Sequence, residues 1–130
     1  MAGKHCPFCQ ADPARVLYES TLAIALTDAF PVNPGHCLVI PRRHVGSWFD
    51  TTDDVRREML ARLDEVRVAV ERSHQPAGFN IGINDGVAAG QTVAHLHIHL
   101  IPRYVGDVAD PRGGIRWVLA QRADYWSTRK

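Results

Sequence analysis

The pattern of apolar and polar residues predicts one long helix in the middle of the chain. Apolar residues recur at spacings of three and four from Val55 to Val70, which puts them on a single helical stripe. Thr51–Asp54 supplies a hydroxyl cap followed by acids at the positive end of the helix dipole. Pro76 and Gly78 end the pattern. We expect this stripe to pack in the core and to have no chemical role.

Shorter apolar runs on both sides of this helix predict strands. A turn at Pro31–Gly35 separates the first runs, and Pro41 and Pro102 end two of the later ones. The predicted strands are two short ones within Arg15–Thr27, then His36–Ile40, Phe79–Asn84 and Val93–Ile101. About five strands with one helix predict an α+β fold, in which the helix packs on one face of an antiparallel sheet.

The composition is that of one ordinary domain. The chain has 130 residues, 45% hydrophobic and 22% charged, without a repeat or linker, so we interpret residues 1–130 as a single domain. Residues from about 104 to 130 match no regular pattern. The net charge of +1 argues against a nucleic-acid partner, and no segment predicts a membrane span or signal peptide. The odd number of cysteines, three, is typical of the reducing cytoplasm.

Three histidines alternate with aliphatic residues in the last predicted strand. Because side chains alternate between faces, His95, His97 and His99 should share one face. Imidazoles act as nucleophiles, general acids or bases, or metal ligands near neutral pH, and a buried row of them is costly without such a use. Gly90-Gln91-Thr92 comes just before and offers close backbone approach and uncharged donors, as a phosphate site would.

The segment Asp85–Arg103 resembles the signature of the histidine-triad (HIT) family, in which three histidines alternate with apolar residues. Its Gly90–Val93 entry and Pro102-Arg103 exit are similar to the fragile-histidine-triad-like dinucleoside polyphosphate hydrolases. Asp28–Pro41 matches a second block of the family. The resemblance runs from Cys6 to about Arg103 and implies the HIT fold, assembled as a two-fold homodimer.

The resemblance also implies an enzyme that cleaves small nucleotides through a nucleotidyl-histidine intermediate. His97 would attack the α-phosphate, His99 would contact the phosphate near the leaving group, and His36 would orient the imidazoles. No catalytic cofactor is required. Further matches to substrate-binding positions are Phe8, Leu26 and Ala29 for the base, Asp28 for the ribose, and Asn84, Gly90, Gln91 and Thr92 for the phosphates. Three of these residues have structural alternatives: Asp28 as a turn cap, His36 as a core histidine and Asn84 as a turn residue.

A CxxC motif near the N-terminus predicts a metal site. Cys6 and Cys9 have the spacing of a zinc knuckle, although two unliganded thiols would have the same spacing. The resemblance implies His44 and His95 as the other ligands, with His5 as an alternative. Such a closed Cys2His2 site would hold structural zinc and tie the N-terminus to the sheet.

Other functions and substrates remain open at the level of sequence. Three histidines also hold catalytic zinc in some enzymes, but steps of about 7 Å along one strand do not converge on an ion with bonds near 2 Å. A nucleotide-binding sensor with little turnover is an alternative of another class. Dinucleoside polyphosphates are favoured by Gly90–Val93, and nucleoside 5'-phosphoramidates by Asp28 and the CxxC motif. An adenine nucleotide is the expected ligand, with specificity set by the tail that contains Trp117, Tyr125 and Trp126.

Overall fold

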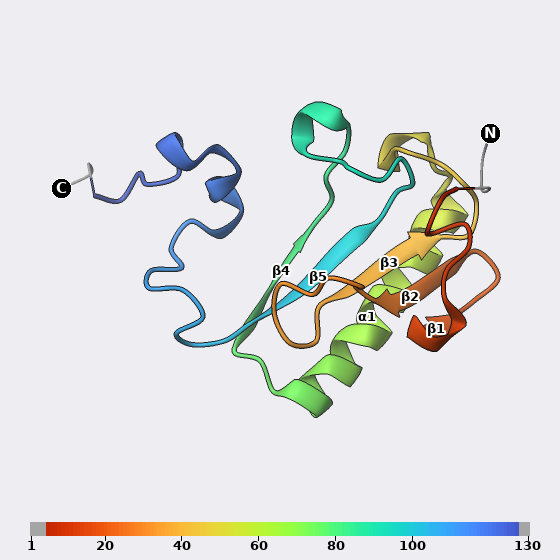
Figure 1. Cartoon of the computed structure of the whole chain (residues 1–130), viewed down its shortest axis with the longest axis horizontal. Helices are drawn as coiled ribbons and strands as arrows, with labels where there is room; N and C mark the ends of the chain where they lie inside the picture. The colour runs from red at the N-terminus through yellow and green to blue at the C-terminus, as the bar shows by residue number, and fades with distance from the viewer. Residues whose placement is uncertain (1–4, 128–130) are drawn as a thin grey trace.

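A five-stranded antiparallel sheet, crossed on one face by a single long helix, forms the body of the protein (Figure 1). The computed structural model describes residues 5–127. The strands are β1 (Val16–Glu19), β2 (Ala23–Thr27), β3 (Cys37–Pro41), β4 (Gly78–Gly82) and β5 (Ile98–Arg103), in the spatial order β1-β2-β3-β5-β4. Short 3-10 turns are η1 (Pro13–Arg15), η2 (Trp48–Asp50), η3 (Val87–Ala89) and η4 (Gly114–Arg122). The predicted α+β fold class is confirmed.

The helix α1 (Asp53–His74) begins and ends where the sequence predicts. Thr52 occupies the cap position, but its hydroxyl contacts the Asp54 carboxylate instead of a backbone N–H. That carboxylate accepts a hydrogen bond from the Val55 N–H at 3.0 Å. Gln75 ends the helix in a left-handed conformation, with φ 53°, directly before Pro76. The apolar stripe is buried against the sheet at Met59, Val66 and Val70.

The sheet separates two apolar clusters, one on each face. Neighbouring residues of β3 belong to different clusters, because Val39 faces α1 and Leu38 faces away from it. The cluster on the α1 face also holds Leu96, Ile98 and Leu100, and the cluster on the other face holds Phe8, Ile24, Leu26 and Ile40. No α-helix of the described chain covers this second face (Figure 1). The histidines lie there, and His97 packs against Phe8 of the second cluster.

The last strand is shorter at its start than predicted. Regular pairing begins at Ile98 instead of Val93 and continues through Pro102 to Arg103. Before Ile98 the backbone has other partners: the Leu96 N–H donates to the Val45 carbonyl at 2.7 Å, and the His95 Nε2–H donates to the Pro41 carbonyl at 2.8 Å. The alternation of side chains nevertheless holds. The residues between the histidines are buried on the α1 face, and the histidines lie on the other.

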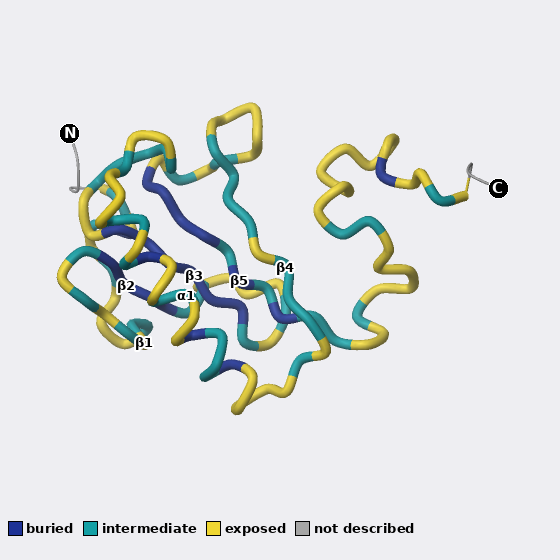
Figure 2. The backbone as a smooth tube through the Cα atoms, turned by 180° about the vertical axis from the view of Figure 1, so that it is seen from behind, coloured by how far each residue is buried: buried dark blue, intermediate teal, exposed yellow. Residues whose placement is uncertain are grey.

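The C-terminal tail (residues 104–127) lies beyond the free edge of β4 (Figure 1). It is mostly exposed, although Ala123 is fully buried (Figure 2). It contains η4, which is kinked at Leu119, and no strand. Within residues 5–127, no helix is both long enough and apolar enough to cross a membrane.

Candidate active site

A cavity of about 300 Å³ opens on the face of the sheet opposite α1. Strand alternation and the preceding loops bring residues from distant parts of the chain to its walls. They include most of the residues that the sequence predicts for catalysis and substrate binding: Phe8, Asp28, Ala29, Asn84, Thr92, His97 and His99. We call this the active-site cavity.

The His97 ring is held in one tautomer by its neighbour in the sequence. Its Nδ1 lies 2.9 Å from the backbone carbonyl oxygen of His95. A carbonyl oxygen only accepts, so Nδ1 carries the proton and Nε2 keeps its lone pair. The rings of Phe8 and His99 pack on either side, with centroids 5.1 and 5.0 Å from that of His97. His97 is therefore a fixed ring with a nucleophilic nitrogen at the cavity wall.

His36 fixes the tautomer of His99 through a chain of hydrogen bonds. The backbone N–H of Val32 donates to His36 Nδ1 at 3.1 Å, so neutral His36 carries its proton on Nε2. That Nε2 lies 3.0 Å from His99 Nδ1 and 3.3 Å from Asp28 Oδ2. When His99 Nδ1 accepts a hydrogen bond from His36 Nε2–H, the proton of His99 itself is on Nε2. His99 then presents an N–H donor to a ligand in the cavity.

Burial keeps both of these imidazoles neutral. It lowers the pKa of His36, an effect that the Asp28 carboxylate opposes. The pKa of His99 falls to about 4, mainly through burial, with the neighbouring His97 and His36 lowering it further. A negatively charged phosphate beside His99 would raise this pKa again. His99 is thus a neutral hydrogen-bond donor without substrate, and it is more readily protonated when a phosphate is bound.

Asp28 makes the turn-capping contact that the sequence left open, and its side chain also lines the cavity. Its Oδ1 accepts a hydrogen bond from the Phe30 N–H at 2.8 Å, which is the turn-capping arrangement. Its Oδ2 faces His36, and the side chain lines the active-site cavity at 15% exposure. Asp28, His36 and His99 bring potential ligand atoms within 4.8 Å of one another. Because the proton of His36 is on the atom that faces the other two, the trio favours proton sharing over metal binding.

Three predicted substrate-binding residues lie elsewhere. Leu26 is fully buried beneath the cavity, and Leu38 lines it instead. Gly90 ends η3 with φ 93°, a conformation that suits glycine, and shapes the loop. The Gln91 side chain braces the same loop: Oε1 accepts from Gly86 N–H at 2.8 Å, and Nε2 donates to the carbonyls of Gly46 and Val93 at 2.9 and 3.0 Å.

The structure also adds cavity residues that the sequence prediction missed. The side-chain alternation of β3 would have indicated Leu38, since it faces the same side as Ile40. Arg15 also lines the cavity, but its guanidinium donates through Nε and Nη2 to the Thr27 carbonyl at 3.0 and 2.8 Å. It therefore braces the wall, and nothing in its sequence context indicates this role.

The four predicted zinc ligands form a second cluster beside the cavity. The ligand atoms of Cys6, Cys9, His44 and His95 all lie within 4.8 Å of one another. Cys6 Sγ is 3.4 Å from His95 Nδ1, and Cys9 Sγ is 3.1 Å from His44 Nδ1. His95 Nε2–H donates a hydrogen bond to the Pro41 carbonyl, so Nδ1 keeps its lone pair, which faces the thiols. This donor set fits tetrahedral zinc, whereas the exposed His5 is not part of the cluster.

Comparison with known proteins agrees with this fold and site. The HIT domain family matches residues 10–106, and the chain belongs to this family. An uncharacterized 16.1 kDa HIT-like protein of Mycoplasma pneumoniae is 37% identical over 108 residues, which are 80% of this chain and 75% of that protein. A crystal structure of a zinc-bound histidine triad family protein from Mycobacterium smegmatis has a TM-score of 0.71 and 37% identity, covering 82% of this chain and 80% of that one.

An enzyme with a named activity is also among the relatives. The asymmetrical bis(5'-nucleosyl)-tetraphosphatase of Schizosaccharomyces pombe is 38% identical over 97 residues. The match covers 75% of this chain but 53% of the yeast enzyme, so the chain spans about half the length of that relative. The likeness therefore concerns only part of the yeast enzyme.

Proposed function

We propose that this HIT protein cleaves nucleotides at the α-phosphate by forming a nucleotidyl intermediate on His97. The observation that carries the proposal is the hydrogen bond from His97 Nδ1 to the His95 carbonyl, which leaves the Nε2 lone pair for attack. The cavity beside this nitrogen brings together the other groups that such a reaction needs.

Each step balances with the groups present. With substrate bound, the phosphate raises the pKa of His99, and the ring carries a second proton. His97 Nε2 forms a bond to the α-phosphorus while the bond from phosphorus to the leaving group breaks. Protonated His99 gives the leaving group its Nε2 proton and becomes neutral. Water then attacks the same phosphorus, loses a proton to His99 and breaks the P–N bond. The products are a nucleoside monophosphate and the protonated leaving group, and both histidines return to their starting forms.

The remaining cavity residues position the substrate. Thr92 and Asn84 offer uncharged donors for phosphate oxygens, and Asp28 offers a carboxylate for the ribose hydroxyls. Phe8 and Ala29 form an apolar slot for the base, for which we propose adenine. His36 acts through His99 by setting its tautomer. Gln91 contributes by holding the loop that carries Thr92.

A dinucleoside polyphosphate is the substrate that the comparisons favour, because the yeast relative is named for cleaving a dinucleoside tetraphosphate. A nucleoside 5'-phosphoramidate, cleaved through the same steps, is the second candidate. We also propose that the protein is a cytoplasmic homodimer. Support for that compartment comes from Cys6, Cys9 and Cys37, none of which forms a disulfide.

We propose structural zinc at Cys6, Cys9, His44 and His95, because the ligand atoms of these four residues lie close together. When bound, the ion cross-links the N-terminal segment to the sheet and supplies no chemical step. Phe8 lies between the two cysteines and packs against the His95 ring, with centroids 5.8 Å apart. The metal site and the base slot therefore share this segment.

The covalent step is tested by intact-protein mass spectrometry after brief mixing with diadenosine tetraphosphate or adenosine 5'-phosphoramidate. We expect an acid-labile gain of one AMP on the wild type and none on His97→Asn. The faster substrate identifies the leaving group. Absence of both turnover and adduct, with nucleotide still bound, would overturn the proposal and favour a nucleotide sensor.

A further inference from the structure

The Pro31–Gly35 turn carries the first donor of the hydrogen-bond chain that runs through His36 to His99. Its Val32 N–H donates to His36 Nδ1 at 3.1 Å, and His36 Nε2 lies 3.0 Å from His99 Nδ1. We call this segment the donor turn. It belongs to no helix or strand of the described chain, and Val32 is 66% exposed. The position of the donor therefore depends on the contacts that hold the turn.

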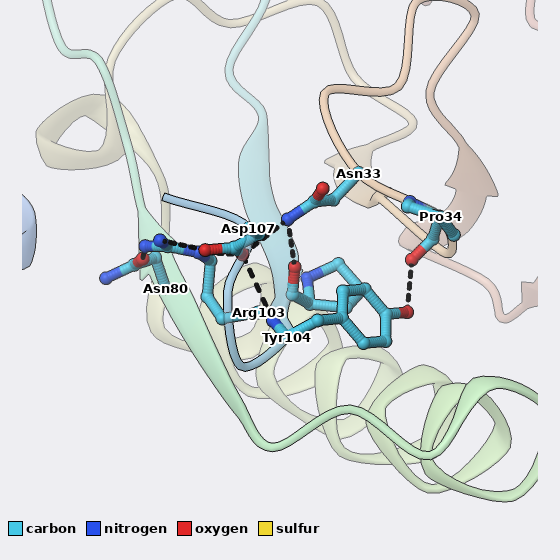
Figure 3. Close-up of polar contacts among 7 residues, drawn as sticks. Asn33, Pro34, Asn80, Arg103, Tyr104 and Asp107 are labelled. Carbon is cyan, nitrogen blue, oxygen red and sulfur yellow. Dashed lines mark hydrogen bonds and ion pairs between the residues drawn. The ribbon is translucent and has the colours of Figure 1, made fainter. Parts of the chain in front are cut away.

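The end of β5 and the segment after it hold the donor turn by hydrogen bonds (Figure 3). Asn33 Nδ2 donates to the Pro102 carbonyl at 3.0 Å and to Asp107 Oδ2 at 2.8 Å. The Tyr104 hydroxyl donates to the Pro34 carbonyl at 2.7 Å. The donor turn is thus tied to residues that lie 69 to 74 positions further along the chain.

Close packing supports the donor turn from its inner side. Gly35 has φ 87°, and a methyl group on it would lie 3.1 Å from Val70 Cγ1 and 3.2 Å from Pro102 Cγ. Both distances are shorter than an ordinary van der Waals contact, so the backbone of the turn rests directly on α1 and β5. The packing keeps the donor turn from moving toward the sheet, and the hydrogen bonds of Asn33 keep it from moving away.

Asp107 is the centre of these hydrogen bonds. Besides the Asn33 amide, its carboxylate accepts hydrogen bonds from Arg103 Nε at 2.7 Å, Arg103 Nη2 at 2.8 Å and the Tyr104 N–H at 3.0 Å. The Arg103 guanidinium holds the pKa of Asp107 well below its usual range, so the carboxylate is charged at neutral pH. A charged acceptor holds the Asn33 amide more strongly than a neutral one would.

Arg103 anchors the Asp107 carboxylate to the sheet. It is the last residue of β5, and its Nη1 donates to Asn80 Oδ1 on β4 at 2.6 Å (Figure 3). Its paired hydrogen bonds to Asp107 also fix the direction of the carboxylate. A continuous set of hydrogen bonds therefore runs from β4 through Arg103, Asp107 and Asn33 to the donor turn. None of the roles proposed above uses these residues.

We propose that Asp107 is a positioning residue for the proton transfer at His99. Acting through Asn33, it holds the donor turn in place, and the donor turn keeps the His36 ring facing His99. This inference rests on the proposed function, in which His36 acts through His99. With the donor turn displaced, His36 Nδ1 would lose its partner. The ring would then be free to rotate away from His99, although Asp28 still faces its Nε2.

Nitrogen-15 NMR of the histidine rings tests this link without substrate. We expect wild-type His99 to be the Nε2–H tautomer, and Asp107→Ala to make it an average of the two tautomers. Asp110→Ala is the matched control, because Asp110 lies in the same segment but pairs with Arg112 on the surface at 2.9 Å. The control should leave the His99 signals unchanged. An unchanged His99 tautomer in Asp107→Ala would overturn the proposal.

Turnover shows whether this positioning matters for the reaction. Asp107 does not line the active-site cavity, so its removal should affect the chemical step more than substrate binding. For the substrate that the wild type turns over faster, we expect Asp107→Ala to lower kcat about tenfold and to keep KM within about twofold. A rise in KM without a fall in kcat would overturn the proposal. Should Asp107→Ala fail to fold, Asn33→Ala removes the same hydrogen bond and keeps the Arg103–Asp107 pair.

The two measurements separate failure of this inference from failure of the proposed function. If the wild type turns over neither substrate, the covalent mechanism is wrong, and the His99 tautomer still decides whether Asp107 orients the ring. A changed tautomer with unchanged kcat would overturn the inference alone, because the positioning would then have no effect on the reaction.

Discussion

The Nδ1 atom of His97 lies 2.9 Å from the backbone carbonyl oxygen of His95, the residue whose ring faces the two thiols of the Cys/His cluster. His95 thus orients the proposed nucleophile through its backbone carbonyl, and its own ring is a proposed zinc ligand. The His95 ring is itself held by the Pro41 carbonyl. The two sites are therefore adjacent through the backbone, and the Phe8 ring packs against both histidine rings.

His97→Asn should remove turnover and keep the fold. The change deletes the nucleophilic nitrogen while retaining a polar side chain of similar reach, so we expect kcat to fall at least about a thousandfold. Calorimetry should still detect nucleotide binding, and the melting temperature should change little. His74→Asn, at the exposed end of α1, is the matched control with full activity. Substantial turnover by His97→Asn would contradict the assignment.

His99 should make the protein less stable in mild acid. Its pKa is lowered from 6.5 to about 4 in the folded state, so between these values the unfolded chain binds more protons. The stabilisation is full above pH 6.5 and is lost as pH falls toward 4. Urea titrations between pH 7 and 4 should show a shallower fall for His99→Gln than for the wild type. His36, His97 and Asp28 surround this ring and are unchanged in the variant. Parallel curves would show that His99 does not titrate in this way.

Removal of a thiol should release the metal and lower thermal stability. Cys9→Ser leaves three of the four ligands, so we expect bound zinc, measured by atomic emission, to fall from about one equivalent to a small fraction. The melting temperature should fall by at least about 5 °C. His5→Asn, a change at the exposed histidine beside the motif, should keep its zinc. Loss of zinc in His5→Asn would show instead that His5 is a zinc ligand in place of one of the two proposed histidines.

Leu100→Ala should destabilise the protein from the face opposite the histidines. Leu100 is fully buried in the cluster against α1, so we expect its truncation to cost about 2–5 kcal/mol in the free energy of unfolding. Urea denaturation measures this value. Leu17→Ala, on the exposed side of β1, should cost less than about 1 kcal/mol. Similar losses in the two variants would argue against the division of the core into two faces.

Gln91→Glu should loosen the loop before the histidines. The carboxylate cannot donate to the carbonyls of Gly46 and Val93, so two hydrogen bonds are lost and two acceptors are left facing it. We expect a cost of about 1–3 kcal/mol in unfolding free energy. Gln121→Glu in the exposed tail is the control for the added charge. A large loss of substrate affinity without any loss of stability would show instead that Gln91 contacts the phosphates directly.

The sequence predicts the parts of the fold that depend on local periodicity. The helix limits follow from the apolar stripe, the acidic first turn and Pro76, and all of these are short-range signals. The one-sided histidine row follows in the same way from alternation. The start of β5 does not, because the Leu96 N–H donates to the Val45 carbonyl, which lies far away in the sequence.

The candidate site shows the same limit. Phe8, Asp28 and Thr92 lie at the cavity as expected, since family motifs fix their positions. The hydrogen bond from the Gln91 side chain to the Gly46 carbonyl joins residues far apart in the sequence, so no local pattern predicts it. Arg103 pairs with Asp107 directly after β5, and the sequence assigned no regular structure to this region.

The alternation of histidine and aliphatic residues along residues 95–100 has a consequence for the effect of mutations. The imidazoles lie on one face of this segment, and the aliphatic side chains that pack in the core lie on the other. A substitution that ends catalysis therefore leaves the interior packing in place, and the cavity for the nucleotide persists. Loss of the proposed activity in this architecture need not mean loss of the fold.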